Sequence, residues 1–291
     1  MYRLGGMILV ALSAAGFGTL ALFGEYAYAD KMDAISILFC RFSLSALVMV
    51  AVLIMRRESL PNGSTLLMLM GMGALGYVGQ SFAYLTALQY ASSGLVALLL
   101  YLYPVFVTLL ASLLLHERIT QMKGLALGIA LVGTALTVDP AGGQILGMVL
   151  AITGAAIYSV YIIVGTHVMK RVSVIQSTAV IFASAGAASG TLMLLNGPHL
   201  PATPSGWTAI LAIVMIATVL PVAAFLAGLE RIGPTNAAML STLEPVVTVI
   251  LGAVLLNETF RPMTLIGGGL ILGAVLLLTR SELRREPNQE K

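Results

Sequence analysis

Charged residues are scarce in this sequence. Only 9% of its 291 residues are Asp, Glu, Lys or Arg, whereas about a quarter of a soluble domain is charged. A chain so poor in charge cannot cover its own surface in water. Because 59% of the residues are hydrophobic and the mean hydropathy is +1.00, the composition excludes an ordinary water-soluble fold and indicates that lipid surrounds most of the chain.

Residues with reactive or metal-binding side chains are also few. The single cysteine, Cys40, has no intramolecular partner, so the sequence carries no disulfide framework. His116-Glu117 is not followed by the second histidine of a zinc-protease helix, and no glycine-rich phosphate loop ending in Lys-Ser or Lys-Thr occurs. We therefore expect no catalytic residue, no metal and no cofactor.

Long apolar runs are what the sequence does contain. A bilayer core about 30 Å thick needs roughly 20 apolar residues per helix. Ten such runs are separated by short polar, Gly or Pro breaks: 4–26, 34–55, 64–86, 93–115, 121–138, 145–166, 174–195, 206–228, 235–256 and 262–279. They are too long and too rich in Leu, Ala and Gly for barrel strands. The sequence therefore predicts an all-α polytopic membrane protein with ten transmembrane helices.

Lys and Arg are distributed unevenly between the loops. If the N-terminus is cytoplasmic, twelve of them lie in inside segments, only Lys31 and Arg261 lie outside, and Arg41 falls within the second span. Because cytoplasmic loops carry the excess of Lys and Arg, we expect both termini in the cytoplasm and the protein in the inner (plasma) membrane. The net charge of +3 is then explained by insertion and by contact with anionic membrane lipids. Nucleic acid is not an expected partner.

The chain repeats itself at a constant offset in residue number. Pro104 and Glu117 recur as Pro245 and Glu258, both at an offset of 141. Each copy holds five spans, and because five is odd, the second copy enters the membrane from the opposite side. Inverted repeats recur in secondary transporters, although a duplication could also have made only a larger helix bundle. The expected division is a first repeat, a second inverted repeat and a polar cytoplasmic tail: 1–141, 142–280 and 281–291.

The duplicated Pro and Glu pattern, together with ten spans in two five-helix halves, resembles the drug/metabolite transporter superfamily and specifically its EamA-type members. The resemblance covers residues 4–280. Within the family, the chain looks most like bacterial inner-membrane exporters of amino acids and related metabolites, including the aromatic amino acid exporter (YddG-like) branch. This implies a secondary transporter, not an enzyme, that exports small metabolites by alternating access. Amino acids are the first expectation, and other amphipathic metabolites or drugs are the alternative.

Two prolines and one acid stand out within the spans. Pro104 and Pro245 each remove one helical hydrogen bond, and a carbonyl freed in lipid must find a partner or face a cavity. Glu244 lies near the middle of span nine, where an acid costs roughly 2.5–3.5 kcal/mol. Such a carboxylate can bind a substrate ammonium or take up a proton when desolvated, or it can be a structural acid paired with polar neighbours. Ser241 lies on the same helical face.

Polar and aromatic residues follow one face of spans three, four and six: Tyr77, Gln80, Tyr84, Tyr101, Tyr158 and Tyr161, with Tyr103 off to one side of span four. A pocket with aromatic walls and few polar groups would suit an amphipathic solute. Ordinary helix packing, with the hydroxyls bonded to backbone, is the alternative. We predict that these residues bind the substrate together with Glu244 and Ser241, and that Pro104 and Pro245 kink the flanking helices.

Other features of the spans suggest structural roles. Arg41 lies a turn or two inside span two, and its long stem allows it to snorkel outward, toward a carboxylate near the span end: Asp33, Asp30 or Glu25. Contact with the substrate is the alternative. Two glycine pairs permit close helix contact and are expected to pack spans five and ten within a monomer: Gly124 with Gly128, and Gly269 with Gly273. Glu117 and Glu258 precede the next helices and are expected to complement their N-termini.

Two other classes of protein remain open at this point. An intramembrane enzyme would need a catalytic dyad or metal cluster at membrane depth, and the histidines lie near span ends or in loops. A structural or receptor-like membrane protein would not require an acid such as Glu244 in the middle of a span. Solute uptake by proteoliposomes separates transport from both.

Overall fold

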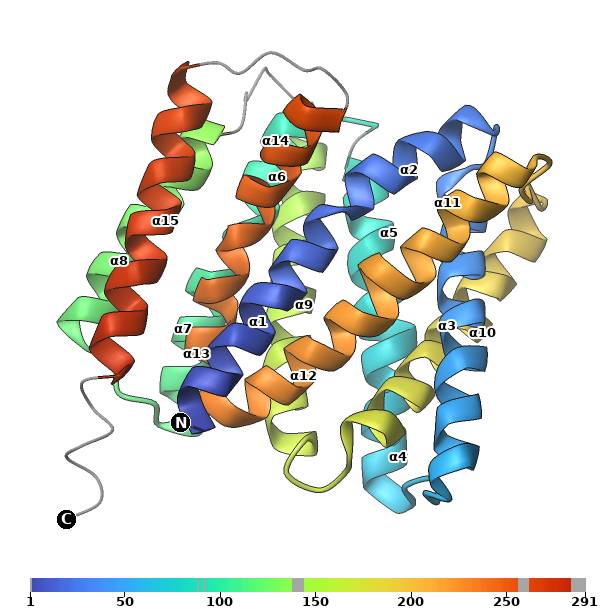
Figure 1. Ribbon diagram of the computed structural model, residues 1–291, viewed down its shortest axis with the longest axis horizontal. Coiled ribbons are helices and arrows are strands. Elements are labelled where there is room, and N and C mark those ends of the chain that lie inside the picture. The colour runs from blue at the N-terminus through green and yellow to red at the C-terminus, as the bar shows by residue number, and fades with distance from the viewer. Residues whose placement is uncertain (1, 88, 92, 138–143, 256–261, 284–291) are drawn as a thin grey trace.

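The computed structural model describes residues 2–87, 89–91, 93–137, 144–255 and 262–283, and all regular structure within them is helical (Figure 1). Eight helical segments are long and apolar enough to cross a membrane, and two shorter apolar ones are Gln121–Leu136 and Leu265–Arg280. Together they match the ten predicted spans. The expected boundary at 141/142, Glu258 and most of the polar tail lie outside the described residues.

Three of the five spans in the first half are interrupted. The elements of spans one to five are, in order, α1 (Tyr2–Gly18) and α2 (Leu20–Ala29); α3 (Ala34–Arg56); α4 (Gly63–Gly71), η1 (Met72–Tyr77) and α5 (Val78–Ala87); α6 (Ser93–Leu100) and α7 (Tyr103–Leu115); and α8 (Gln121–Thr137). The segment η1 is π-helical. Such segments are rare and occur often at functional sites.

The second half repeats most of these interruptions. The elements of spans six to ten are α9 (Ile145–Val168); α10 (Val174–Asn196); α11 (Pro204–Val214), η2 (Met215–Val219) and α12 (Leu220–Ile232); α13 (Pro234–Leu240), η3 (Ser241–Leu243) and α14 (Glu244–Leu255); and α15 (Pro262–Leu283). The segment η2 is also π-helical. The repeat offset places 72–77 on 213–218, so the two π segments occupy equivalent places in spans three and eight.

Local sequence explains where several spans begin. The Asp33 carboxylate accepts a hydrogen bond from the backbone N–H of Ser36 at 2.9 Å and caps α3. Ser173 and Gln176 form a reciprocal capping box at the start of α10. Thr203 caps α11 and is followed by Pro204, which has no N–H to leave unsatisfied. These caps satisfy N–H groups that a helix end otherwise leaves unpaired.

Contacts between the halves follow the symmetry of an inverted repeat. Span two packs along span seven (α3 on α10), and span five along span ten (α8 on α15). Span one packs on span eight (α1 on α12), and its counterpart, span six, packs on span three (α9 on α5). Span four meets span nine through α7 and α13. The start of α1 and the end of α15 lie at the same end of the molecule (Figure 1).

Spans five and ten are held together by glycines other than those expected. A Cβ atom added to Gly133 would lie 2.7 Å from the carbonyl oxygen of Gly267, so the backbones touch only because Gly133 has no side chain. The two predicted pairs have open space where a Cβ would be: Gly124, Gly128, Gly269 and Gly273. The prediction that these spans pack together is confirmed, but the assignment of those glycine pairs to the contact is wrong.

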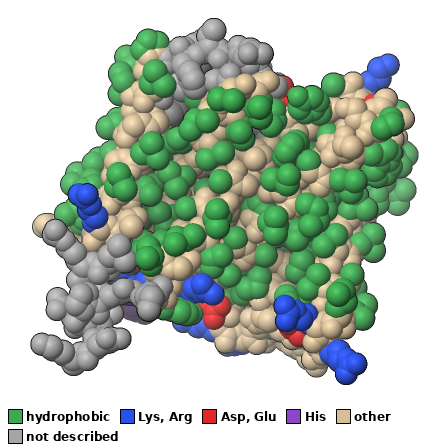
Figure 2. All heavy atoms as spheres, viewed as in Figure 1, with side chains coloured by type: hydrophobic (Ala, Val, Ile, Leu, Met, Phe, Trp, Pro, Cys, Tyr) green, Lys and Arg blue, Asp and Glu red, His purple; other side chains and the backbone are tan. Residues whose placement is uncertain are grey.

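The flank of the bundle presents apolar side chains, as a lipid-facing surface should. Figure 2 shows hydrophobic side chains over most of the visible face, with most of the visible Lys and Arg at the end that carries the N-terminus. Leu113 and Leu194, for example, are 72% and 77% exposed. Exposing so large an apolar surface to water is unfavourable. The helices are therefore transmembrane, and the protein is integral to a membrane.

Candidate functional site

Spans four and nine are both broken where their prolines remove a backbone donor. Helix α6 ends at Leu100 and α7 begins at Tyr103, one residue before Pro104. In span nine the 3-10 segment η3 separates α13 from α14, and α14 begins with Glu244-Pro245. The two breaks are equivalent under the repeat offset. Each half therefore brings a span broken at a proline to the contact between spans four and nine.

Glu244 lies at one of these breaks. It is the first residue of α14 and follows the 3-10 segment η3 directly. The side chain is half-buried. Its charge acts on tyrosines of spans three, four and six: Tyr77, Tyr84, Tyr101, Tyr103 and Tyr158. Six of the predicted site residues are thus within electrostatic reach of one another.

Five of the predicted tyrosines form a continuous chain of ring contacts. Ring centroids are 5.3 Å apart between Tyr77 and Tyr161 and 5.8 Å apart between Tyr161 and Tyr158. The chain continues from Tyr158 to Tyr103 at 4.9 Å and from Tyr103 to Tyr101 at 6.5 Å. These separations lie in the range of favourable aromatic pairs. An aromatic row therefore runs from span three through span six to span four.

The tyrosine hydroxyls differ in how they are satisfied. The Tyr103 hydroxyl donates to the carbonyl of Ala238 at 3.4 Å and lies beside the hydroxyl of Ser241, so it links span four to span nine. The Ser241 hydroxyl itself donates to Ala237 at 3.0 Å. The buried Tyr161 hydroxyl has no hydrogen-bond partner among the described residues. Buried polar groups are rarely left unpaired, so this hydroxyl is a candidate for a contact with solute or water.

Two predicted residues take no part in the ring contacts of the aromatic row. Tyr84 packs with a small apolar cluster that contains Ala87, Val96 and Ala151. The Gln80 side chain accepts from the Ser81 hydroxyl at 3.5 Å and forms no other hydrogen bond with the residues that the structure describes. The charge of Glu244 still reaches Tyr84.

Arg41 is a charged residue of the interior that the sequence prediction directed outward. It is only 5% exposed. Its Nε–H donates to the Thr218 hydroxyl at 2.7 Å, and Nη2 donates to the Ala217 carbonyl at 3.3 Å. The guanidinium carbon lies 5.1 Å from the ring centroid of Phe42 and 5.9 Å from that of Tyr77. Such distances permit cation–π attraction.

The expectation that Arg41 snorkels outward is therefore wrong. The π segment η2 offers it a hydroxyl and a backbone carbonyl in the interior, which replace the solvation that snorkelling would provide. Asp33 instead caps α3, and Asp30 accepts hydrogen bonds from the backbone N–H groups of Thr203 and Ala202. The backbone hydrogen bond from Thr203 lowers the pKa of Asp30, which lies outside the spans. A sequence signal existed, because an ionisable residue inside a span marks a functional site by default.

The contacts of Arg41 place it near the symmetry axis. Tyr77 and Thr218 are equivalent residues under the repeat offset, and Arg41 contacts both. The Thr218 hydroxyl donates to the carbonyl of Ile213 at 2.8 Å, so it bridges the π segment and accepts from Arg41 at the same time. Arg41 and Glu244 also act on each other electrostatically.

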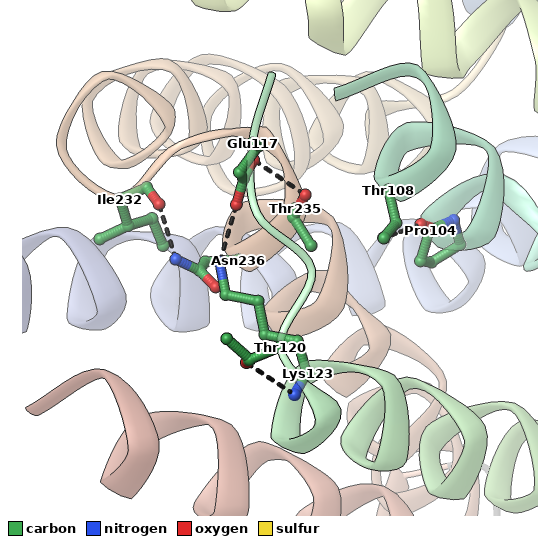
Figure 3. Close-up of polar contacts among 8 residues, drawn as sticks. All are labelled: Pro104, Thr108, Glu117, Thr120, Lys123, Ile232, Thr235 and Asn236. Atoms are coloured by element: carbon green, nitrogen blue, oxygen red, sulfur yellow. Dashed lines mark hydrogen bonds and ion pairs between the residues drawn. The ribbon is translucent and has the colours of Figure 1, made fainter. Parts of the chain in front are cut away.

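A polar junction joins the two halves at one end of the molecule. Glu117 lies between Lys123 and Thr235 (Figure 3). One carboxylate oxygen of Glu117 is 2.7 Å from the Lys123 ammonium, and the other accepts from the Thr235 hydroxyl at 2.9 Å. Glu117 therefore pairs with a side chain in the first turn of α8 and ties the α7–α8 connection to α13. Its expected counterpart Glu258 lies outside the described residues.

Comparisons with known proteins agree with this architecture. The EamA-like transporter family matches the chain twice, over residues 4–139 and 145–280. An uncharacterized transporter of Archaeoglobus fulgidus is 26% identical over 94% of this chain and 96% of its own length. The uncharacterized inner membrane transporter YedA of Escherichia coli is 25% identical over 82% of this chain and 79% of its own. A solved crystal structure matches with a TM-score of 0.83 and 23% identity, covering 96% of this chain and 98% of that one, which shows the fold.

Proposed function

The chain belongs to the EamA-like transporter family of the drug/metabolite transporter superfamily, and from this premise we propose that it exports amino acids by alternating access. The proposed solutes carry aromatic or other hydrophobic side chains. Export proceeds from the cytoplasm across the inner membrane, with both termini cytoplasmic. The protein acts as a monomeric secondary transporter without a cofactor.

The observation that carries this proposal is the position of Glu244. A carboxylate at membrane depth can pair with an ammonium group, and the surrounding tyrosine rings supply apolar area and additional attraction for a cation. An amine attached to an apolar or aromatic body fits both properties. The unpartnered Tyr161 hydroxyl adds a polar group within the same aromatic row.

The helix breaks support alternating access. Discontinuous helices near the midplane, at the interface of inverted repeats, are a recurring site of substrate binding in secondary transporters. The breaks before Pro104 and Pro245 lie in spans four and nine, which contact each other across the interface. Rocking of the two halves about this contact would expose the site to one side and then to the other.

Counterflow in proteoliposomes tests the proposal. Purified protein should exchange at least one amino acid of a panel in the absence of ATP, and Glu244→Gln should lower the rate at least tenfold because it removes the charge and keeps the shape. Glu230→Gln is the matched control, since Glu230 is an exposed carboxylate of α12. Expression and thermal stability of both variants should stay near the parental values.

Three outcomes would overturn parts of the proposal. A strict ATP requirement would exclude a secondary transporter. Exchange of drug-like amines alone, with no amino acid transported, would favour the alternative class of amphipathic solutes. If Glu244→Gln transports every solute of the panel at the parental rate, the carboxylate is structural.

A further inference from the structure

We infer that Arg41 binds the carboxylate of the transported solute, so that the solute is a zwitterion held between Arg41 and Glu244. This inference rests on the proposed function and narrows it. An amine without a carboxylate would engage only Glu244, and an acid without an amine would engage only Arg41. The class of solute is then the α-amino acid itself and excludes its amine or its acid analogue.

Arg41 is a buried cation that forms no ion pair with the acidic side chains that the structure describes. The side chain is 5% exposed, and among the described residues no Asp or Glu side chain forms an ion pair with it within 4.0 Å. Removing one partner of a buried ion pair is strongly destabilising because the remaining charge is uncompensated. The rings of Phe42 and Tyr77 offset part of the free-energy cost of burying the Arg41 charge. An anion supplied by the solute would complete the compensation.

The guanidinium also has unused donors. Arginine carries five N–H groups in a planar fork that matches a carboxylate. Hydrogen bonds to Thr218 and Ala217 account for one donor on Nε and one on Nη2. Three further N–H groups make no protein hydrogen bond within the described part of the chain. They are enough for a two-point contact with one carboxylate.

Thr218 acts as a positioning residue for this fork. Its hydroxyl donates to Ile213 and accepts from Arg41, so the hydroxyl has a fixed direction and holds Nε. A rigidly held guanidinium loses little side-chain entropy when an anion binds. The π segment η2 therefore contributes to recognition by orienting Arg41.

Glu244 supplies the opposite charge in the same region. Arg41 and Glu244 act on each other and both act on Tyr77, but they form no direct ion pair. The two charges are therefore separated while sharing one aromatic neighbour. A zwitterion satisfies both at once, with its apolar side chain free to contact the tyrosine row.

The test uses L-phenylalanine and phenethylamine, which differ by the carboxylate. The parental protein in proteoliposomes should transport L-phenylalanine at least tenfold better than the amine. Arg41→Lys keeps the charge but loses the fork, and it should reduce this preference about tenfold, mainly by slowing L-phenylalanine. Arg231→Lys on α12 is the matched control and should leave the preference unchanged. Thr218→Val should shift the preference in the same direction as Arg41→Lys.

A binding measurement keeps the inference testable if the Arg41 variant does not fold. L-Phenylalanine should raise the melting temperature of the parental protein in detergent, whereas phenethylamine and 3-phenylpropionate should raise it much less. Equal transport of L-phenylalanine and phenethylamine by the parental protein would overturn the role of Arg41 and leave the proposed function intact. Equal losses for both solutes in Arg41→Lys would assign Arg41 to holding η2 only. Absence of transport for every amino acid would instead refute the proposed function.

Discussion

Arg41 and Glu244 both carry a charge at membrane depth, and the structure stabilises each in a different way. Glu244 lies half-buried at the break in span nine, where the charge of Arg41 stabilises its carboxylate. Arg41 is held by Thr218, Ala217 and two aromatic rings. The insertion of either charge costs roughly 2.5–3.5 kcal/mol. Retaining both residues at this cost is consistent with a role in binding.

Substitution of Tyr101 tests whether the aromatic row contacts the side chain of the solute. Its ring contacts Tyr103, and the charge of Glu244 reaches it. Tyr101→Ala should weaken the apparent affinity for L-phenylalanine about tenfold, because an aromatic contact contributes about 0.5–1.5 kcal/mol beyond its buried area. The affinity for L-alanine should change less than about threefold. The concentration dependence of counterflow measures both.

Tyr101→Phe is the control for this prediction, since it keeps the ring and removes only the hydroxyl. It should transport L-phenylalanine with nearly parental affinity. Equal weakening for L-phenylalanine and L-alanine in Tyr101→Ala would mean that this residue shapes the helix break and does not contact the solute.

Position within an apolar run can be read from the sequence, so residues that lie deep in the membrane could be predicted. Glu244, Tyr101, Tyr103 and Tyr158 were selected because they fall well inside apolar runs, and Tyr77 and Tyr161 because they share a helix face with other polar residues. Arg41 was misassigned because its direction depends on Thr218, a partner far along the chain, and span position says nothing about that partner. The unpartnered Tyr161 hydroxyl was likewise beyond prediction, since satisfaction of a hydroxyl depends on neighbouring helices.

At the scale of helices, run length located the spans but not their interruptions. The prolines indicated breaks in spans four and nine, because proline removes a backbone donor wherever it lies. The π segments η1 and η2 carry no comparable signal, since an extra residue per turn is stabilised by contacts such as that of Arg41 with Ala217. The close contact at Gly133 could not be predicted either, because the spacing of glycines does not indicate which face of a helix packs on the neighbouring helix.

Substitutions in the polar junction formed by Glu117, Lys123 and Thr235 measure how much the contact between the two halves contributes to stability. Glu117→Gln should destabilise the protein by about 2 kcal/mol, because it removes the 2.7 Å ion pair between Glu117 and the nearly buried Lys123 ammonium. This is less than the roughly 3–5 kcal/mol of a fully buried pair, because Glu117 keeps 23% of its side-chain surface accessible. Thermal unfolding in detergent measures the change.

Two further variants complete this test. The double variant Glu117→Gln/Lys123→Met should lose less stability than the sum of the single changes, by roughly 1 kcal/mol, as expected for residues in contact. Arg118→Met changes an exposed neighbour and should alter stability by less than about 0.5 kcal/mol. Strict additivity of the Glu117 and Lys123 changes would mean that the ion pair contributes nothing.

At the scale of the whole molecule, the repeat offset predicted an arrangement that the packing reproduces. Spans two and seven, five and ten, and four and nine pair with their own counterparts, whereas one with eight and six with three exchange places. Such long-range pairings follow from a two-fold relation once the repeat offset is known. Local departures from symmetry could not be inferred from it: span six is one continuous helix, whereas its counterpart, span one, is divided into α1 and α2.

Membrane orientation is a prediction at this scale. Single cysteines introduced at Ser281 and at Gly142, in a Cys40→Ala background, can be labelled with an impermeant reagent in intact cells. The distribution of Lys and Arg predicts labelling at Gly142, which lies outside the described residues, and protection at Ser281 until the cells are opened. External labelling at Ser281 would reverse the proposed orientation.

The exchange of residues between the halves has a kinetic consequence. The repeat offset maps Arg41 onto Phe182 and Glu244 onto Tyr103, so each interior charge occurs in one half and is an aromatic residue in the other. Identical halves would give inward-open and outward-open states of equal free energy, and the empty protein would divide its time equally between them. With unequal halves the two states solvate the charges differently, and a difference of about 1.4 kcal/mol changes their ratio tenfold. Half-saturation should then require different solute concentrations at the two membrane faces, while net flux still follows the gradient.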